Sequence, residues 1–204
     1  MRALLLFLIL SGLTLSQAQA KDAMLIAAFG DSLVAGYGVA PGDAFPARLE
    51  KAMNAQGLNV KIINDGVSGD TTAGGLARVD YVVKQKPVLV VIVLGGNDLL
   101  RGLPPEDVRR NLAAIMEHFA QAGIKMVVAG QMAPLSLGTK YANAYNAVFC
   151  DLAKQYNAGC YPFFLDGVYN HPELMQADGI HPNAQGAAFI ADKIKPLVSA
   201  QLKR

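Results

Sequence analysis

The chain carries little net charge. Its 204 residues contain 18 Lys and Arg against 16 Asp and Glu, which gives a formal net charge of +2 at pH 7. Nucleic-acid binding depends on Lys and Arg side chains that neutralise several backbone phosphates. A balance this close to neutral therefore argues against a nucleic-acid partner.

Several sequence signatures of known protein classes are absent. The segment 30–38 does not fit G-x-G-x-x-G, and no G-x-x-x-x-G-K-[ST] occurs, so the sequence has no phosphate-binding loop of a known type. Ser32 is followed two positions later by Val34 instead of Gly, which excludes the G-x-S-x-G turn of the α/β-hydrolases. Only three histidines are present, without paired ligand spacing, so no metal site is predicted.

Long hydrophobic runs are also absent. The N-terminus carries an apolar run of about 13 residues after Arg2, and it ends near Ala18-Gln19-Ala20. This length is typical of a secretory signal and is shorter than the roughly 20 residues of a bilayer span. We therefore expect residues 1–20 to be a signal peptide cleaved near Ala20 and Lys21; the alternative is a short membrane anchor. Residues 21–204 are then expected to form a single domain, exported to the periplasm or secreted, monomeric and without stable membrane insertion.

The chain has only two cysteines, Cys150 and Cys160. In an oxidising compartment, two cysteines ten positions apart can form a disulfide. However, Cys150 lies in a segment of helical pattern and Cys160 opens an apolar stretch, so both could be small buried apolar residues. The sequence leaves both states open.

Short aliphatic runs alternate with longer segments of helical period along the rest of the chain. Such alternation is typical of a parallel sheet covered by helices on both faces. The sequence predicts an α/β fold: a three-layer α/β/α sandwich with a five-stranded parallel sheet in the order 2-1-3-4-5. The predicted strands are residues 24–29, 59–63, 88–94, 124–129 and 161–165. The predicted helices are residues 44–56, 71–85, 105–122, 141–156, and a last helix that begins after Asn183 and kinks or restarts at Pro196.

Polar residues and glycines follow these strands where each strand ends. Ser32 lies three residues after the first strand, Gly69 follows the second, and Asn97 follows the third. The segment Asp178-Gly179-Ile180-His181 comes after the fifth strand. Because the carboxyl ends of parallel strands lie at one edge of the sheet, we expect these four segments to meet in one crevice.

Three of these residues suit nucleophilic catalysis. A serine hydroxyl is a weak nucleophile until a base removes its proton, and the base works best when a third group fixes its tautomer. Asp178 and His181 are three residues apart in one loop, so the carboxylate can accept a hydrogen bond from imidazole Nδ1. Nε2 is then free to take the proton of Ser32.

Attack on an acyl carbon also needs hydrogen-bond donors where negative charge develops on oxygen. The candidate donors are the Ser32 N–H, the Gly69 N–H and the side-chain amide of Asn97. Glycine suits the second position because it has no Cβ to keep the backbone away from the oxyanion. Asp31 and Asp98 are instead expected to bond backbone amides and fix their turns.

Four segments resemble the ordered sequence blocks of the SGNH, or GDSL, hydrolases. They are Gly30-Asp31-Ser32-Leu33, Ser68-Gly69-Asp70-Thr71, Gly96-Asn97-Asp98 and Asp178-x-x-His181. The resemblance spans about residues 24–190. It implies a flavodoxin-like fold and an esterase and thioesterase of broad acyl range that needs no cofactor or metal and acts on small acyl esters, thioesters and lysophospholipids. One departure is Leu99, which stands where close relatives usually carry Gly and which borders the oxyanion donor.

Two apolar loops are predicted to overhang the crevice. Leu99, Leu100 and Leu103 follow the third strand, and Met132 and Pro134 follow the fourth. These side chains can line an acyl groove or pack against one another as ordinary loop core. The resemblance to the SGNH hydrolases favours the groove.

We weigh the sequence against three alternative functions. The favoured one is a serine hydrolase of acyl esters and thioesters, with a Ser-His-Asp triad and a Ser/Gly/Asn oxyanion hole. A carbohydrate O-acetyl esterase of the same family would need a shallow polar cleft instead of loops rich in Leu and Pro. A non-catalytic exported domain that binds nucleotides would need the phosphate loop that this sequence lacks.

Overall fold

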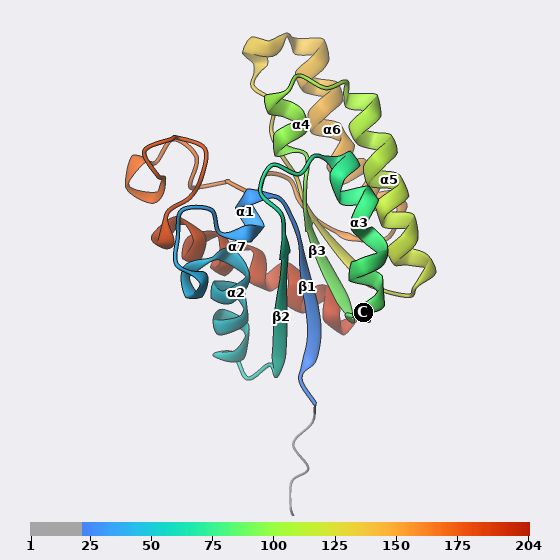
Figure 1. Cartoon of the computed structure of the whole chain (residues 1–204), viewed down its shortest axis with the longest axis vertical. Coiled ribbons are helices and arrows are strands. Elements are labelled where there is room, and N and C mark those ends of the chain that lie inside the picture. Colours follow the sequence, from blue (N-terminus) through green and yellow to red (C-terminus); the bar gives the residue numbers. More distant parts are fainter. Residues whose placement is uncertain (1–21) are drawn as a thin grey trace, which may run out of the picture.

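A computed structural model describes residues 22–204 (Figure 1). The predicted signal peptide at residues 1–20 lies outside the described residues. None of the helices in residues 22–204 combines the length and hydrophobicity that a membrane crossing requires. In chain order, the elements are β1 Met24–Gly30, α1 Ser32–Ala35, η1 Pro41–Asp43, α2 Phe45–Asn54, β2 Val60–Gly66, α3 Thr72–Lys84, β3 Leu89–Val93, α4 Gly96–Leu100, α5 Pro105–Gln121, β4 Lys125–Ala129, η2 Leu135–Leu137, α6 Thr139–Gln155, β5 Gly159–Tyr161, η3 Pro172–Leu174 and α7 Ala184–Lys203.

The five strands form a parallel sheet in the order β2-β1-β3-β4-β5. The central strand, β3, consists entirely of buried Leu, Val and Ile residues. Such a composition suits a strand that is covered on both faces. The predicted α/β fold and its strand order are confirmed.

Helices cover both faces of the sheet, and each face has its own core. Ile26 and Ala28 of β1 point toward the face covered by α2 and α7, where they join Phe45, Leu49 and Ile190. The intervening strand residues point to the other face, which α3, α5 and α6 cover. This division follows from the period of two along a strand, and it gives the three layers that the sequence predicts.

The carboxyl ends of the strands carry two short helices. α1 follows β1 after one residue, and α4 follows β3 after two. The end of β2 packs closely on α1, because a Cβ on Gly66 would collide with the backbone of Ala35. Glycine is therefore required at the end of β2 to bring the second strand against the helix that begins at Ser32.

Two predictions about element boundaries need correction. The sequence predicts the fifth strand at residues 161–165, but β5 ends at Tyr161. Pro162 has no backbone N–H with which to continue the ladder, and Phe164 and Leu165 are buried in the loop that follows. The apolar run therefore reflects burial of a loop. Of the two alternatives predicted for Pro196, a kink or a restart of the last helix, the restart is wrong, because α7 continues through this residue.

Cys150 of α6 and Cys160 of β5 form a disulfide, which decides between the two states that the sequence leaves open. The bond links the last helix before β5 to a short strand at the edge of the sheet. Closing a loop of ten residues removes conformational freedom from the unfolded chain, worth about 3 kcal/mol by the loop-entropy relation.

We expect the double variant Cys150→Ala/Cys160→Ala to have a free energy of unfolding about 2–3 kcal/mol below that of the wild type. Urea denaturation measures this difference. A reducing agent should lower the stability of the wild type by a similar amount and leave the variant unchanged. Equal stability of wild type and variant would contradict the prediction.

Candidate active site

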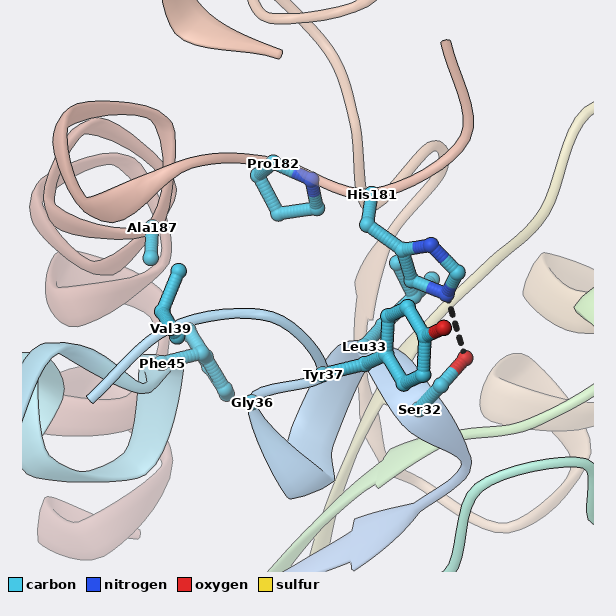
Figure 2. Close-up of a pocket in the computed structure, with 9 residues that line it drawn as sticks. All are labelled: Ser32, Leu33, Gly36, Tyr37, Val39, Phe45, His181, Pro182 and Ala187. Carbon is cyan, nitrogen blue, oxygen red and sulfur yellow. Dashed lines mark hydrogen bonds between the residues drawn. The ribbon is translucent and has the colours of Figure 1, made fainter. Parts of the chain in front are cut away.

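Ser32, His181 and Asp178 form a hydrogen-bonded series at the carboxyl edge of the sheet. His181 Nε2 lies 2.8 Å from Ser32 Oγ (Figure 2), and His181 Nδ1 lies 2.7 Å from Asp178 Oδ2. Ser32 and His181 are 149 positions apart in the sequence. An ionised carboxylate can only accept, so Nδ1 carries the imidazole proton and Nε2 accepts from the serine hydroxyl.

The start of α1 positions Ser32. Asp31 caps this helix, because its Oδ1 accepts a hydrogen bond from the Leu33 N–H at 3.0 Å, and its own N–H donates to the Val93 carbonyl of β3. Asp31 therefore fixes the turn, as the sequence predicts. It is only 1% exposed, and this burial raises the pKa of its carboxyl group to about 6.

A tight turn holds Asp178 and His181 together. Asp178 Oδ1 accepts from the N–H groups of His181 and Ile180 at 3.0 and 2.9 Å, and these bonds, led by that of His181, lower the pKa of Asp178 to about 2. The Tyr37 ring packs beside the imidazole, with ring centroids 4.6 Å apart (Figure 2). The Gln176 amide donates to the Tyr37 carbonyl at 2.7 Å and so ties this loop to the one after α1.

The three candidate oxyanion donors border one cavity. Within residues 22–204, neither the Ser32 N–H nor the Gly69 N–H has a hydrogen-bond acceptor. Gly69 has φ +86°, a left-handed conformation that favours glycine. The Asn97 amide nitrogen donates to the Asp70 carbonyl at 2.9 Å and makes a longer bond, 3.3 Å, to Asp31 Oδ2.

Asp98 ties α4 to the segment that follows β2. Its carboxylate accepts from the Thr72 N–H at 2.8 Å and from the Thr72 hydroxyl at 2.6 Å. Burial raises the pKa of Asp98. The predicted role of Asp98 in fixing the local backbone agrees with these bonds, which join the two segments that carry Gly69 and Asn97.

A cavity of about 650 Å³ opens beside Ser32. Of the residues predicted to line it, Leu99, Leu100, Met132 and Pro134 do so. Leu103 does not line the cavity; its carbonyl accepts from the hydroxyl of Tyr141 at 2.9 Å. Apolar lining residues that the sequence analysis missed are Leu33, Tyr37, Leu137, Phe163, Leu165, Tyr169 and Ile180.

The missed residues lie outside the helices that the sequence predicts. Phe163 and Leu165 fall within the run that the sequence analysis assigns to a strand, and Ile180 lies between the two residues of the Asp178 and His181 turn. The position of Ile180 within this motif is a sequence signal that could have indicated it, whereas Phe163 and Leu165 carry no such signal. Among residues 22–204, no three His, Cys, Asp or Glu side chains gather closely enough to hold a metal ion.

Known proteins with similar sequences and structures match nearly the whole chain. Esterase TesA of Pseudomonas aeruginosa is 37% identical over 203 residues, covering 99% of this chain and 100% of the relative. Thioesterase 1/protease 1/lysophospholipase L1 of Escherichia coli is 38% identical over 188 residues, covering 90% and 88%. The crystal structure of AlinE4, an SGNH-hydrolase family esterase, matches with a TM-score of 0.76 and 43% identity over 89% of this chain and 98% of AlinE4.

The family model that matches this chain covers all four sequence blocks. A model of the GDSL-like lipase/acylhydrolase family matches residues 28–189, which include Ser32, Gly69, Asn97, Asp178 and His181. Together with the similarity to the SGNH-hydrolase family esterase AlinE4, this match shows that the chain belongs to the GDSL-like lipase/acylhydrolase family.

Proposed function

We propose that this serine ester hydrolase cleaves acyl esters and thioesters through a triad of Ser32, His181 and Asp178. The observation that carries the proposal is the continuous series of hydrogen bonds, 2.8 and 2.7 Å long, from the serine hydroxyl through the imidazole to the carboxylate. This arrangement suits a nucleophile, a general base and a group that orients the base.

In the first half of the reaction, Ser32 Oγ attacks the acyl carbon and His181 Nε2 takes the hydroxyl proton. The carbonyl oxygen becomes an oxyanion that accepts hydrogen bonds from the Ser32 N–H, the Gly69 N–H and the Asn97 amide. The hydrogen bond from the Asn97 amide to Asp31 Oδ2 is long, at 3.3 Å, and therefore weak. It is the bond that the oxyanion replaces. His181 then gives its proton to the departing alcohol or thiol, and an acyl-serine remains.

In the second half, a water molecule attacks the acyl-serine while His181 Nε2 takes one of its protons. The same donors hold the second oxyanion. Collapse of this intermediate releases the carboxylic acid and returns the proton to Ser32 Oγ. Asp178 stays ionised throughout and holds Nδ1–H, so the imidazole keeps the orientation that both halves need.

The apolar cavity wall favours a substrate whose acyl chain lies beside Ser32. Leu99, Leu100, Met132, Pro134 and Leu165 supply apolar surface there. An acyl chain gains free energy when such surface is removed from water, whereas a sugar ring would need polar partners. The names esterase, thioesterase, arylesterase and lysophospholipase among the relatives support the same substrate class.

We further propose that residues 1–20 direct export and are removed, and that residues 21–204 act as one monomeric domain in the periplasm or outside the cell. The apolar run and the small residues before Lys21 support this proposal.

A substrate panel tests the function. We expect purified protein to hydrolyse p-nitrophenyl acyl esters, palmitoyl-CoA and lysophosphatidylcholine, with a higher kcat/KM for butanoyl and longer esters than for acetyl esters, because longer chains bury more apolar surface. Acetylated xylo-oligosaccharides serve as the comparison. Preference for these sugars would instead indicate an O-acetyl esterase, and no hydrolysis of any compound would leave only a binding role.

A further inference from the structure

Arg78, in the middle of α3, makes polar contacts with three separate segments beside the proposed active site. Its Nε donates to Asp70 Oδ2 at 2.7 Å, its Nη1 to the Asp65 carbonyl at 2.8 Å and its Nη2 to the Gly30 carbonyl at 2.8 Å. The guanidinium also lies over the Phe29 ring, 4.4 Å from its centroid. The side chain is only 20% exposed, so these contacts hold it in one place.

The three segments are those that must be held in register for the oxyanion donors to converge. Gly30 ends β1 two residues before Ser32, and Asp65 is the penultimate residue of β2. Asp70 directly follows Gly69. One guanidinium therefore connects the backbone that carries the Ser32 N–H to the loop that carries the Gly69 N–H.

Asp70 extends this connection to the third donor. While its carboxylate binds Arg78, its backbone carbonyl accepts from the Asn97 amide at 2.9 Å. The neighbouring Gly69 carbonyl accepts from Arg101 Nη2 at 3.0 Å. Displacement of Asp70 would thus move the Gly69 N–H directly and the Asn97 amide through its hydrogen bond.

We propose that Arg78 is a positioning residue for the oxyanion hole, which sets the spacing among the donors of Ser32, Gly69 and Asn97. The proposal rests on the function proposed above. Arg78 does not line the cavity, so it acts only through the backbone and side chains that it holds. Its planar fork binds three acceptors in three directions, and a lysine ammonium on a flexible stem cannot reproduce that geometry.

The expected effect is on kcat. Donors that are misplaced by a fraction of an ångström still leave room for the substrate but bind the developing charge poorly, and a displacement of about 1 Å can cost 10²-fold in rate. We expect Arg78→Lys to lower kcat for p-nitrophenyl butyrate by roughly 10- to 100-fold, with KM unchanged within about twofold.

A double-mutant cycle with Asn97→Ala separates positioning from a general structural role. Asn97→Ala alone should lower kcat by about 10²–10³-fold, by analogy with the loss of one oxyanion donor. In that background, Arg78→Lys should cost only about threefold more, because one of the donors that Arg78 positions is already missing. Arg48→Lys is the matched control, since Arg48 is also partly buried and pairs with one carboxylate, that of Asp43, away from the cavity. It should leave kcat unchanged in both backgrounds.

Urea denaturation of each variant shows whether the comparison involves folded protein. If Arg78→Lys does not fold, Asp70→Asn replaces it in the cycle, because this change removes the charge that binds Arg78 and keeps the backbone carbonyl that binds Asn97. The inference is overturned if the folded variant keeps the wild-type kcat, if only KM changes, or if the fold-losses multiply in the cycle. Failure of the wild type to hydrolyse any acyl ester would instead overturn the proposed function.

Discussion

Replacement of Ser32 with Ala is expected to lower kcat for acyl esters by about 10⁶-fold, the size of the loss seen when other serine hydrolases lose the nucleophile. The reason is that Ala leaves no oxygen to attack the acyl carbon, while the oxyanion donors and the cavity remain. Steady-state hydrolysis of p-nitrophenyl butyrate, followed to the detection limit, measures the loss.

Covalent labelling separates loss of the nucleophile from loss of the fold. Diethyl p-nitrophenyl phosphate should add one diethylphosphoryl group to the wild type, detectable by mass spectrometry, and none to Ser32→Ala. Ser68→Ala is the control, because Ser68 also borders the cavity while the Nε2 atom of His181 is paired with Ser32, and this variant should still be labelled. A labelled Ser32→Ala protein, or an unchanged rate, would mean that another residue is the nucleophile.

The second large effect is expected for Asp178→Asn, which should lower kcat by about 10⁴-fold. Asparagine can present its amide N–H to His181 Nδ1, so the imidazole proton moves to Nε2, which can then no longer accept from Ser32. The introduced side-chain amide would keep an oxygen for the N–H groups that Asp178 Oδ1 now binds, and for that reason the turn should persist. Rates measured between pH 7 and 9 test this.

The chain offers a matched control for Asp178→Asn. His171 and Glu173 form another imidazole–carboxylate pair, 3.2 Å apart and outside the cavity wall, so Glu173→Gln should leave kcat unchanged. A loss of less than about tenfold for Asp178→Asn would mean that a different group orients His181.

The pKa of Asp178 also predicts how acid acts on this turn. The carboxyl pKa is lowered from its ordinary 3.8 to about 2 in the folded chain, so its bonds favour the folded state fully above about pH 4. This contribution is lost as the pH falls from about 4 through 2. Asp178 therefore stays ionised at every pH used for the kinetic tests.

Alternation of aliphatic runs and helical segments was enough to predict the sheet and its order. The position of Ser32, Asn97 and the Asp178 and His181 turn after predicted strands was enough to predict that they converge. These inferences succeed because parallel strands with crossover helices place all their carboxyl ends at one edge of the sheet, so position along the sequence determines position on that edge.

Features that depend on contacts between distant segments could not be read in the same way. Arg78 occupies an ordinary position in a helical pattern, and its three acceptors are known only once β1, β2 and the loop after β2 are assembled. Phe164 and Leu165 look like strand residues because burial in a loop and burial in a strand select the same side chains. Leu103 is apolar and follows a strand, as expected of a groove residue, but it does not line the cavity.

The direction of α7 has a practical consequence. The helix begins after Asn183, beside the loop that carries Asp178 and His181, and ends where the Leu202 carbonyl accepts from Lys125 at the start of β4. The strand β1 also starts at that edge (Figure 1). A linker that attaches the enzyme to a bead or an electrode through its last residues would therefore leave from the side opposite the crevice. Immobilised in this way, the enzyme would present its substrate entrance to the bulk solution.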